Sequence, residues 1–271
     1  MDGVWLARMS ADRFVDWTEH SRRGFVDQQV RSGALPPSEA EAYASQQLTA
    51  LLPQGRSTRG HHFWTVHADG DEVGTLWLRV RGDGADREAY VFDVEVAPGF
   101  RGRGLGRATM RAAEDASRGL GARWMRLNVF GHNTPAIGLY DGLGYRTVAA
   151  VLASSLDRIG EPSDQGPSEV RLSVRRDAPD DDEIWVAERG GVEVGALRMR
   201  AQRRSNGLHL DGRDFFVTRV DAAPRVVAAV ERLSRDRGVV SLALSVTEPG
   251  LRHVCEQRGY VLTAQLMQKR L

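Results

Sequence analysis

The sequence predicts an α/β protein built from two related domains, and three observations carry that prediction. The chain has 271 residues, enough for two modest domains with their own cores. Strand-like and helix-like segments follow one another through the first half in the order β-α-α-β-β-β-α-β-α-β. Part of that pattern then returns, because Trp64–Gly74 is matched by Trp185–Gly195 at a constant offset of 121 positions.

Local signals place each element of the first half. The second helix is entered through Pro36-Pro37-Ser38, and Asp69-Gly70-Asp71 marks a hairpin turn. Thr134 is suited to cap a helix whose first position is Pro135. In chain order the sequence predicts a strand at 4–9, helices at 11–32 and 37–52, a hairpin of 61–68 and 72–80, a central strand at 89–96, a helix from about 104, a strand at 123–129 and a helix from 134.

The segment 94–107 has the pattern of a strand, a sharp glycine turn and the start of a helix. The turn has the spacing Arg-x-x-Gly-x-Gly, and its glycines allow the left-handed backbone in which N–H groups face a bound anion. The helix adds its unpaired N–H groups and the positive end of its dipole. The sequence therefore predicts a diphosphate cradle, to which Arg101, Arg103 and Arg107 add full positive charges.

Two other phosphate-binding motifs fail at this turn. A dinucleotide fingerprint needs Gly-x-Gly-x-x-Gly, and its third glycine falls on Arg107 or Thr109 in the two available registers. A P-loop needs Gly-Lys-Ser/Thr, whereas the only lysine of the chain is Lys269. An ordinary glycine turn with solvated arginines remains as the alternative that needs no ligand.

A second motif follows at residues 128–145. It runs Asn-Val-Phe-Gly-His-Asn from Asn128 and Leu-Tyr-Asp-Gly-Leu-Gly-Tyr from Leu139. In this order and spacing the two motifs together resemble the signature of the GNAT superfamily of acyl-CoA-dependent N-acetyltransferases. A narrower resemblance, carried by Leu52-Pro53-Gln54-Gly55 and His61-His62, is to a bacterial group of small-molecule GNAT proteins.

The resemblance implies two GNAT-like domains, each a mixed, mostly antiparallel sheet flanked by helices. It implies acetyl-CoA as co-substrate and no metal. The backbone of Val94 and Val96 is expected to pair with the pantetheine arm, with an amide near Val96 donating to the thioester oxygen, and Asn133 is expected to bind the pantetheine or a bridging water. The cofactor-binding residues that it implies are Val94, Val96, Arg101, Gly102, Arg103, Gly104, Leu105, Gly106, Arg107, Asn133 and Tyr140.

The central strand carries two carboxylates. By simple alternation, one face of the sheet receives Tyr90, Phe92, Val94 and Val96, and the other receives Val91, Asp93 and Glu95. Ionised carboxylates in a covered strand are costly unless they are solvated or paired, and a substrate cavity would solvate them. We favour Glu95 as the general base for the amine, because it is nearer the expected thioester, with Asp93 second. The alternative is a salt bridge to an arginine such as Arg79 or Arg126.

The matching tyrosine of the family implies that Tyr140 protonates the departing thiolate, with simple helix packing as the alternative. Asn128 stands where ribosomal-protein N-terminal acetyltransferases carry a glutamate, and an amide cannot act as a base. This places the base on the strand at 89–96 and weakens a protein N-terminus as acceptor. In this family the first two helices often wall the acceptor site, where the candidates are Trp17, Glu19, His20, Phe25 and Gln28; packing explains Trp17 and Phe25 equally well.

Three further features carry weaker hypotheses. His61 and His62 are adjacent on a strand and point opposite ways, so no joint metal site is expected. His132 lies in the loop beside the expected acetyl site, where substrate binding and plain solvent exposure are both open. Cys255 lies on a predicted helix, where packing explains it better than a nucleophilic role.

The second half repeats the pattern without its chemistry. Residues 215–224 echo 90–98, and Arg258-Gly259-Tyr260 echoes Leu143-Gly144-Tyr145. The glycine turn is absent before the helix at 225–230, and no tyrosine matches Tyr140.

The domain limits follow from a linker-like composition between the two halves. The segment 170–174 is either the first strand of the second half or a last strand of the first sheet. We expect a catalytic domain at 1–158, a linker at 159–168 and a degenerate GNAT-like domain without the coenzyme A turn at 169–271.

Composition excludes several classes of protein. A net charge of +1 gives no basic footprint for nucleic acid. The chain has no apolar run of 18 residues, and its first residues lack a signal-peptide pattern. One cysteine allows no internal disulfide. These features predict a cytoplasmic protein, and arginine in place of lysine hints at a bacterial source with a GC-rich genome.

Taken together, the residues and the resemblance predict an N-acetyltransferase. It would move acetyl from acetyl-CoA to a primary amine of a small molecule in one ternary-complex step. One alternative is a non-catalytic acyl-CoA-binding sensor or assembly module. Another is a GNAT that acetylates a protein N-terminus or aminoacyl-tRNA, although the near-neutral charge disfavours tRNA. No nucleic-acid or membrane partner is expected, and a homodimer is left open.

Overall fold

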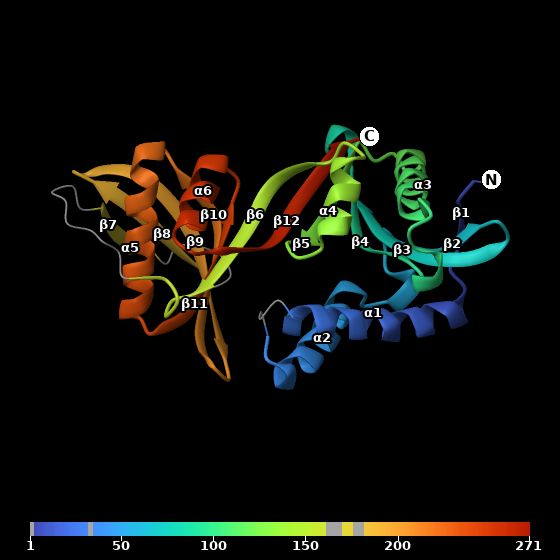
Figure 1. Cartoon of the computed structure of the whole chain (residues 1–271), viewed down its shortest axis with the longest axis horizontal. Coiled ribbons are helices and arrows are strands. Elements are labelled where there is room, and N and C mark those ends of the chain that lie inside the picture. Colours follow the sequence, from blue (N-terminus) through green and yellow to red (C-terminus); the bar gives the residue numbers. More distant parts are fainter. Residues whose placement is uncertain (1–2, 32–34, 161–169, 176–181) are drawn as a thin grey trace. The chain divides into compact units, whose positions relative to one another are not determined.

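The structure, a computed structural model, describes residues 3–31, 35–160, 170–175 and 182–271. Its contacts divide the chain into two compact units, each of which is described by itself (Figure 1). The first unit consists of Met1–Asn128, Pro135–Arg146 and Met267–Leu271, and the second of Val129–Thr134 and Thr147–Leu266. From residue 161 to 168 the predicted linker lies outside the described residues.

These units do not coincide with the predicted domain limits. The strand that follows Tyr145 falls in the second unit from Thr147 on, although the limit at 158 gives it to the first domain. The last five residues of the chain fall in the first unit. The limits at 158 and 169 therefore stay a proposal for where one sequence repeat ends and the next begins.

A mixed, mostly antiparallel sheet forms the centre of the first unit. Strands β1 to β4 pair as antiparallel neighbours in chain order, and β5 joins β4 in parallel. The strands are β1 (Trp5–Arg8), β2 (His61–Ala68), β3 (Asp71–Arg81), β4 (Glu88–Val96) and β5 (Trp124–Phe130). Asp69 and Gly70 form the predicted hairpin turn, with positive φ of 51° and 92°.

Helices cover both faces of this sheet. α1 (Ala11–Arg31) and α2 (Pro37–Leu51) lie on one face and α3 (Leu105–Gly119) on the other, while α4 (Thr134–Asp141) follows β5 (Figure 1). Trp17 of α1 is fully buried, with ring centroids 5.2 Å from Phe63 and 5.4 Å from Trp77. This aromatic packing fixes α1 over strands β2 and β3. None of the helices in the described ranges is long and apolar enough to cross a membrane.

Strand β4 contains a β-bulge at Phe92. Its neighbour β3 pairs Leu78 with Val91 but Trp77 with Asp93, so β4 holds one residue more than β3 here. Because Leu78 and Trp77 face opposite sides of the sheet, Val91 and Asp93 do too. Phe92 stacks on Trp77 at 4.5 Å and so shares the side of Asp93. The predicted alternation, which put Val91 with Asp93, is wrong because the bulge resets it.

Beyond the bulge, β4 and β5 separate. They pair only from Glu88 with Trp124 to Val91 with Leu127. Residues 92–96 of β4 keep β3 on one side and, in the part of the chain that the structure describes, have no strand neighbour on the other. We call this open edge of β4 the slot.

The second unit repeats the plan of the first. Its strands follow the order β12-β6-β11-β10-β9-β8-β7. The elements are β6 (Arg146–Ser155), β7 (Val170–Arg175), β8 (Glu183–Arg189), β9 (Val192–Arg204), β10 (Gly207–Val217), α5 (Ala223–Asp236), β11 (Val239–Val246), α6 (Pro249–Gln257) and β12 (Val261–Arg270). β7 pairs with β8, so the segment from Val170 belongs to the second half. β12 belongs to the second unit up to Leu266 and to the first from Met267.

Strand register aligns the two repeats residue by residue. Gly74 pairs with Val96 in the first unit and Gly195 with Val217 in the second, both 121 positions apart. The predicted match of 215–224 with 90–98 aligned Pro224 with Pro98. It is therefore displaced by four or five positions from the register that the strands show. In the observed register Phe216 stands in the place of Glu95.

Candidate active site

The slot exposes main-chain groups of β4. Ala97 N–H donates to Val73 O at 2.9 Å, so the flanking pair Gly74–Val96 is of the type that does not hydrogen-bond across the two strands. The N–H and C=O groups of Val96, and by the two-residue period those of Val94, therefore point away from β3 and into the slot. An extended chain that carries amides can add to this edge as a strand would.

The glycine turn after β4 is an open cradle at the start of α3. Gly102 and Gly104 have φ of 77° and 79°, and Gly104 caps the helix in the left-handed conformation. A Cβ added at either glycine would meet nothing within 4 Å. Within the described ranges, the N–H groups of residues 102–106 have no partner. Free N–H groups at a helix N-terminus suit a diphosphate, so the residues present fit the one that coenzyme A carries.

The three cradle arginines lie around this turn but are held by neighbouring groups. Arg101 Nε donates to Val96 O at 2.8 Å, and its Nη2 lies 3.3 Å from Glu95 Oε1. Arg103 donates to Gly99 O at 3.0 Å, and Arg107 to Gly142 O at 2.8 Å. Each guanidinium remains exposed enough to turn toward an anion, but Arg101 must first break its contacts with Val96 O and Glu95 of β4.

Asp93 is the more enclosed of the two strand carboxylates. Trp17 Nε1 donates to its Oδ2 at 3.1 Å. Burial raises the pKa of Asp93 above its ordinary value, and the Glu95 charge raises it further, against the lowering effect of the Trp17 hydrogen bond. A carboxyl with a raised pKa is a stronger base than an exposed aspartate once it is ionised.

Glu95 instead lies between two basic groups. His20 Nε2 lies 2.7 Å from Glu95 Oε2, and Arg101 holds the other oxygen. The predicted alternative, an ion pair with an arginine, is present for Glu95, but its partner is Arg101 and not the two arginines suggested, of which Arg126 pairs with Glu88 at 3.1 Å. The bulge places Glu95 on the side of the sheet that α1 covers, and the short contact with His20 of α1 holds the carboxylate there.

Tyr140 of α4 meets the requirements for a proton donor. Its side chain is buried, 7% exposed, and its hydroxyl makes no hydrogen bond with any described residue. Burial raises the pKa of Tyr140 to about 12, and the Asp93 carboxylate contributes to the rise. The charge of Asp93 thus favours the protonated form of Tyr140, the form that a proton donor needs.

Of the five acceptor-wall candidates, Trp17 and His20 reach the carboxylates of β4. Glu19 is bonded to Arg22 and Arg23 on its own helix, and Phe25 stacks on Tyr43 at 6.2 Å. Gln28 keeps a buried Oε1 without a partner among the described residues. Sequence reasoning missed the Trp17–Asp93 hydrogen bond, because no local pattern links positions 76 apart.

The two adjacent histidines of β2, His61 and His62, are structural groups. His61 Nδ1 accepts from Trp77 Nε1 at 2.9 Å, and burial lowers the pKa of His61 to about 4. His62 stacks on Trp64 at 5.4 Å, on the other side of β2. The described residues hold no cluster of three metal-binding side chains. His132 and Asn133 belong to the second unit, whereas the slot belongs to the first, so their roles at the acetyl site stay predictions.

The described residues of the second unit contain no counterpart of this site. β10 and β11 stay paired as far as Phe215 with Val246, so no slot opens. Tyr145 N–H bonds to Tyr140 O in the first unit and Tyr260 N–H to Cys255 O in the second, which puts Cys255 in the place of Tyr140. Burial raises the pKa of Cys255 to about 12, so it stays a thiol.

Comparison with known proteins assigns the family. Residues 27–145 match the Acetyltransferase (GNAT) family. Over 141 residues the chain is 31% identical to YdgE of Bacillus subtilis, named an uncharacterised N-acetyltransferase, in a match that covers 52% of this chain and 90% of YdgE. The chain belongs to the GNAT acetyltransferase family. It is an acyltransferase whose family uses acetyl-CoA, and its second unit repeats the strand register of the first.

Two further relatives extend this result. YycN of Bacillus subtilis, also named an uncharacterised N-acetyltransferase, is 29% identical over 154 residues, which cover 56% of this GNAT protein and 99% of YycN. The crystal structure of YycN matches with a TM-score of 0.51 and covers 53% of this chain and 92% of that one. Streptothricin acetyltransferase of Streptomyces lavendulae is 38% identical over 92 residues, covering 34% of this chain and 48% of that protein.

Proposed function

We propose that the first unit transfers acetyl from acetyl-CoA to a primary amine of a small molecule by direct attack in a ternary complex. The observation that carries the proposal is that an open glycine cradle directly follows the unpaired edge of β4 in the unit that also contains Asp93 and Tyr140. One relative is named streptothricin acetyltransferase, and a name that gives streptothricin as the acceptor supports a small-molecule amine as the acceptor here.

In this proposal Asp93 is the general base, in preference to Glu95. Asp93 takes the proton that the amine loses as its nitrogen bonds to the thioester carbon. The N–H of Val96 or a neighbour donates to the carbonyl oxygen as negative charge develops there. The carbon–sulfur bond then breaks, and Tyr140 gives its proton to the departing thiolate. Asp93 returns a proton to Tyr140, which restores both groups.

Two measurements test this proposal. Titration calorimetry with coenzyme A measures binding and stoichiometry, for which we expect one molecule per chain because the second unit has no slot. A panel of amino sugars, amino acids, polyamines and amine-bearing antibiotics is then mixed with acetyl-CoA while free thiol is followed. Binding without thiol release across the panel would favour a sensor, and acetylation of peptides or aminoacyl-tRNA alone would replace the acceptor class.

Replacing Tyr140 tests the proton donor. We expect Tyr140→Phe to lower kcat about 10–100-fold, because the hydroxyl is lost while the ring still packs. The loss is smaller than for a poorer leaving group, since a thiol with a pKa of about 8.5 departs readily as thiolate. Coenzyme A affinity should not change. Tyr260→Phe, which removes the hydroxyl of a buried tyrosine in the second unit that corresponds to Tyr145, is the control; equal turnover in both variants would reject the role.

Replacing Glu95 tests whether Arg101 is shared between the carboxylate and the cradle. Arg101 bonds Glu95 and Val96 O, so binding a diphosphate through Arg101 breaks those contacts. We expect Glu95→Gln to tighten coenzyme A binding about two- to five-fold, the modest size of a partly exposed ion pair. Calorimetry measures the change. Unaltered or weaker binding would show that Arg101 stays on β4 in the complex.

A further inference from the structure

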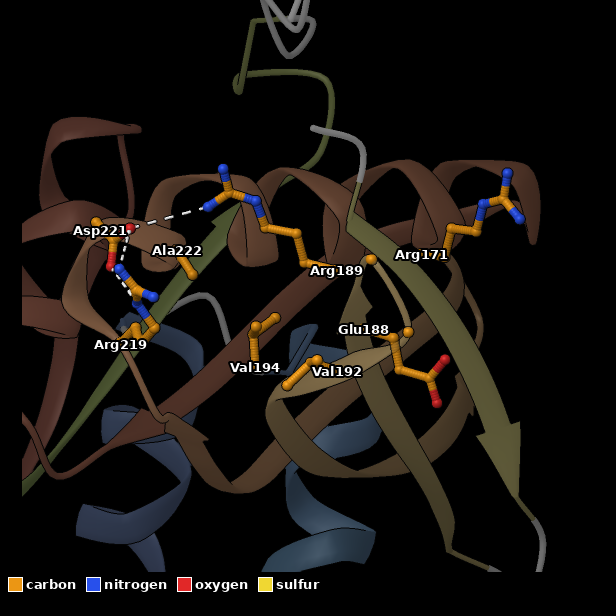
Figure 2. Close-up of a pocket in the computed structure, with 10 residues that line it drawn as sticks. Arg171, Glu188, Arg189, Val192, Val194, Arg219, Asp221 and Ala222 are labelled. Carbon is orange, nitrogen blue, oxygen red and sulfur yellow. Dashed lines mark hydrogen bonds and ion pairs between the residues drawn. The ribbon is translucent and has the colours of Figure 1, made fainter. Parts of the chain in front are cut away.

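The second unit contains a hollow that the transfer reaction does not use. Its volume is about 930 Å³, within the usual size range of ligand sites. It lies where β7, the β8–β9 turn and the segment after β10 meet (Figure 2). Val192 and Val194 provide apolar surface, and Val192 is 65% exposed. The turn itself is Gly190-Gly191, with φ of 59° and 79°.

Arginines from three separate segments line this hollow. Arg171 comes from β7, Arg189 from the end of β8, and Arg219 from the segment after β10. Figure 2 shows Arg189 and Arg219 both turned toward Asp221, which lies 3.8 Å from Arg189 and 3.1 Å from Arg219. One carboxylate is thus divided between two guanidinium groups, which leaves positive charge uncompensated on that wall.

Arg171 stands on the other wall. It has no ion pair or hydrogen bond with any residue that the structure describes, although Glu188 is its partner in the strand register. In Figure 2 the Arg171 and Glu188 side chains point away from each other. The hollow is therefore lined by three guanidinium groups and two carboxylates, of which Arg189 and Arg219 share Asp221 while Arg171 and Glu188 are not paired with each other.

The first unit carries different chemistry at the same strand positions. There the pair that corresponds to Arg171 and Glu188 is Trp5 and His67, whose rings stack at 4.3 Å. Ala68 stands where the second unit has Arg189. The charged lining is therefore a property of the second repeat alone and does not come with the shared fold.

We propose that this hollow binds a small oxyanion with an apolar body, a carboxylate or a phosphate ester. Planar guanidinium groups bind either oxyanion through paired N–H donors, and the two valines contact the apolar part. Asp221 is the internal competitor, since it holds the two arginines that the anion needs. The proposal concerns the second unit and does not depend on the acetyl-transfer site.

Calorimetry on the full chain tests the proposal, with inorganic phosphate, benzoate and phenyl phosphate as probes. We expect saturable binding of benzoate or phenyl phosphate, at least five-fold tighter than inorganic phosphate. Whichever of benzoate and phenyl phosphate binds more tightly shows whether the hollow prefers a carboxylate or a phosphate ester. Arg171→Gln and Arg219→Gln should each weaken it at least five-fold, whereas Asp221→Asn should tighten it about two- to five-fold by releasing both arginines.

Two controls separate this hollow from other anion sites. Arg252→Gln removes a partly exposed arginine of α6 that pairs with Glu256 and lies outside the hollow, so affinity should stay unchanged. Gly104→Val places a β-branched residue at φ of 79° and disrupts the cradle of the first unit. Binding that survives Arg171→Gln and Arg219→Gln but disappears in Gly104→Val would overturn the proposal, as would the absence of saturation with all three probes.

Discussion

Asp93→Asn should lower kcat/KM about 10²–10⁴-fold, the range typical of losing a general base. The amide keeps the size of the side chain, and its oxygen still accepts from Trp17 Nε1, which lies 3.1 Å from Asp93 Oδ2. What disappears is the ability to take a proton from the amine. Coenzyme A affinity should stay within about two-fold, because Asp93 faces α1 and not the cradle.

The pH profile separates this role from a structural one. A base acts when it is ionised, so activity should rise with pH through the pKa of Asp93, which burial and the Glu95 charge raise above its ordinary value. The acid limb of kcat/KM should therefore lie above the usual aspartate range in the parent and be absent in Asp93→Asn. Tyr140, with its pKa raised to about 12, stays protonated across that window.

Stability gives an independent check on the same variant. For a carboxyl whose pKa is raised on folding, the native state binds the proton more tightly than the unfolded state. The resulting stability is complete below the unfolded pKa and is lost as pH rises through the folded pKa. At neutral pH the buried, ionised Asp93 lowers the stability of the parent, and the neutral amide does not. The free energy of unfolding of Asp93→Asn should therefore be at least that of the parent.

Asp214→Asn is the matched control for Asp93→Asn. Asp214 lies 121 positions further on, at the bulge of β10, where it is exposed and 3.6 Å from Arg198. It is close to no acid corresponding to Tyr140, since Cys255 stands there. Equal kinetic loss in both variants, or an unchanged acid limb in Asp93→Asn, would remove Asp93 from the reaction and leave Glu95 as the base.

Local signals in the sequence were sufficient for most elements of the fold. The helices at 11–31 and 37–51 and the hairpin at 61–81 lie within one or two residues of their predicted ends, because capping residues, proline and turn glycines act over a few positions. The mixed sheet followed from the family resemblance and is confirmed. The glycine cradle was also readable, since positive φ at Gly102 and Gly104 is a property of the residue itself.

The site was less predictable, because its details depend on pairing between distant segments. Nothing in the run 89–96 marks Phe92 as an extra residue; the bulge exists only relative to β3. That one residue decides which face receives Asp93 and Glu95. The same limit explains the repeat register, where two prolines suggested an alignment that the strand pairing does not follow. Expectations built on alternation failed where the strand is irregular, which is also where β4 leaves β5.

Lys269→Met should lower the stability of the first unit by about 2–4 kcal/mol, because it leaves a buried carboxylate without its main partner. Lys269 Nζ lies 2.8 and 2.7 Å from the two oxygens of Glu114 on α3, and the Glu114 side chain is only 4% exposed. Arg118, 3.7 Å away and partly exposed, compensates for some of the loss. Urea unfolding measured by tryptophan fluorescence checks the value. Five of the six tryptophans lie in the first unit and only Trp185 lies in the second, so the signal reports mainly on the first unit.

The double variant Lys269→Met/Glu114→Gln separates ion pairing from packing. With the charge of Glu114 also removed, most of the lost stability should return, because an uncharged pair costs far less to bury. Arg252→Gln, which breaks an exposed pair with Glu256, should change stability by less than about 1 kcal/mol.

If Lys269→Met behaved like this surface control, Glu114 would be adequately held by Arg118 alone. A large loss would instead mean that α3, which begins at the cradle, depends on the last strand of the chain, where Met267 is fully buried and Leu271 N–H bonds to Arg123 O at 2.9 Å. Loss of coenzyme A affinity in proportion to the loss of stability would then connect these residues of β12 to the site itself.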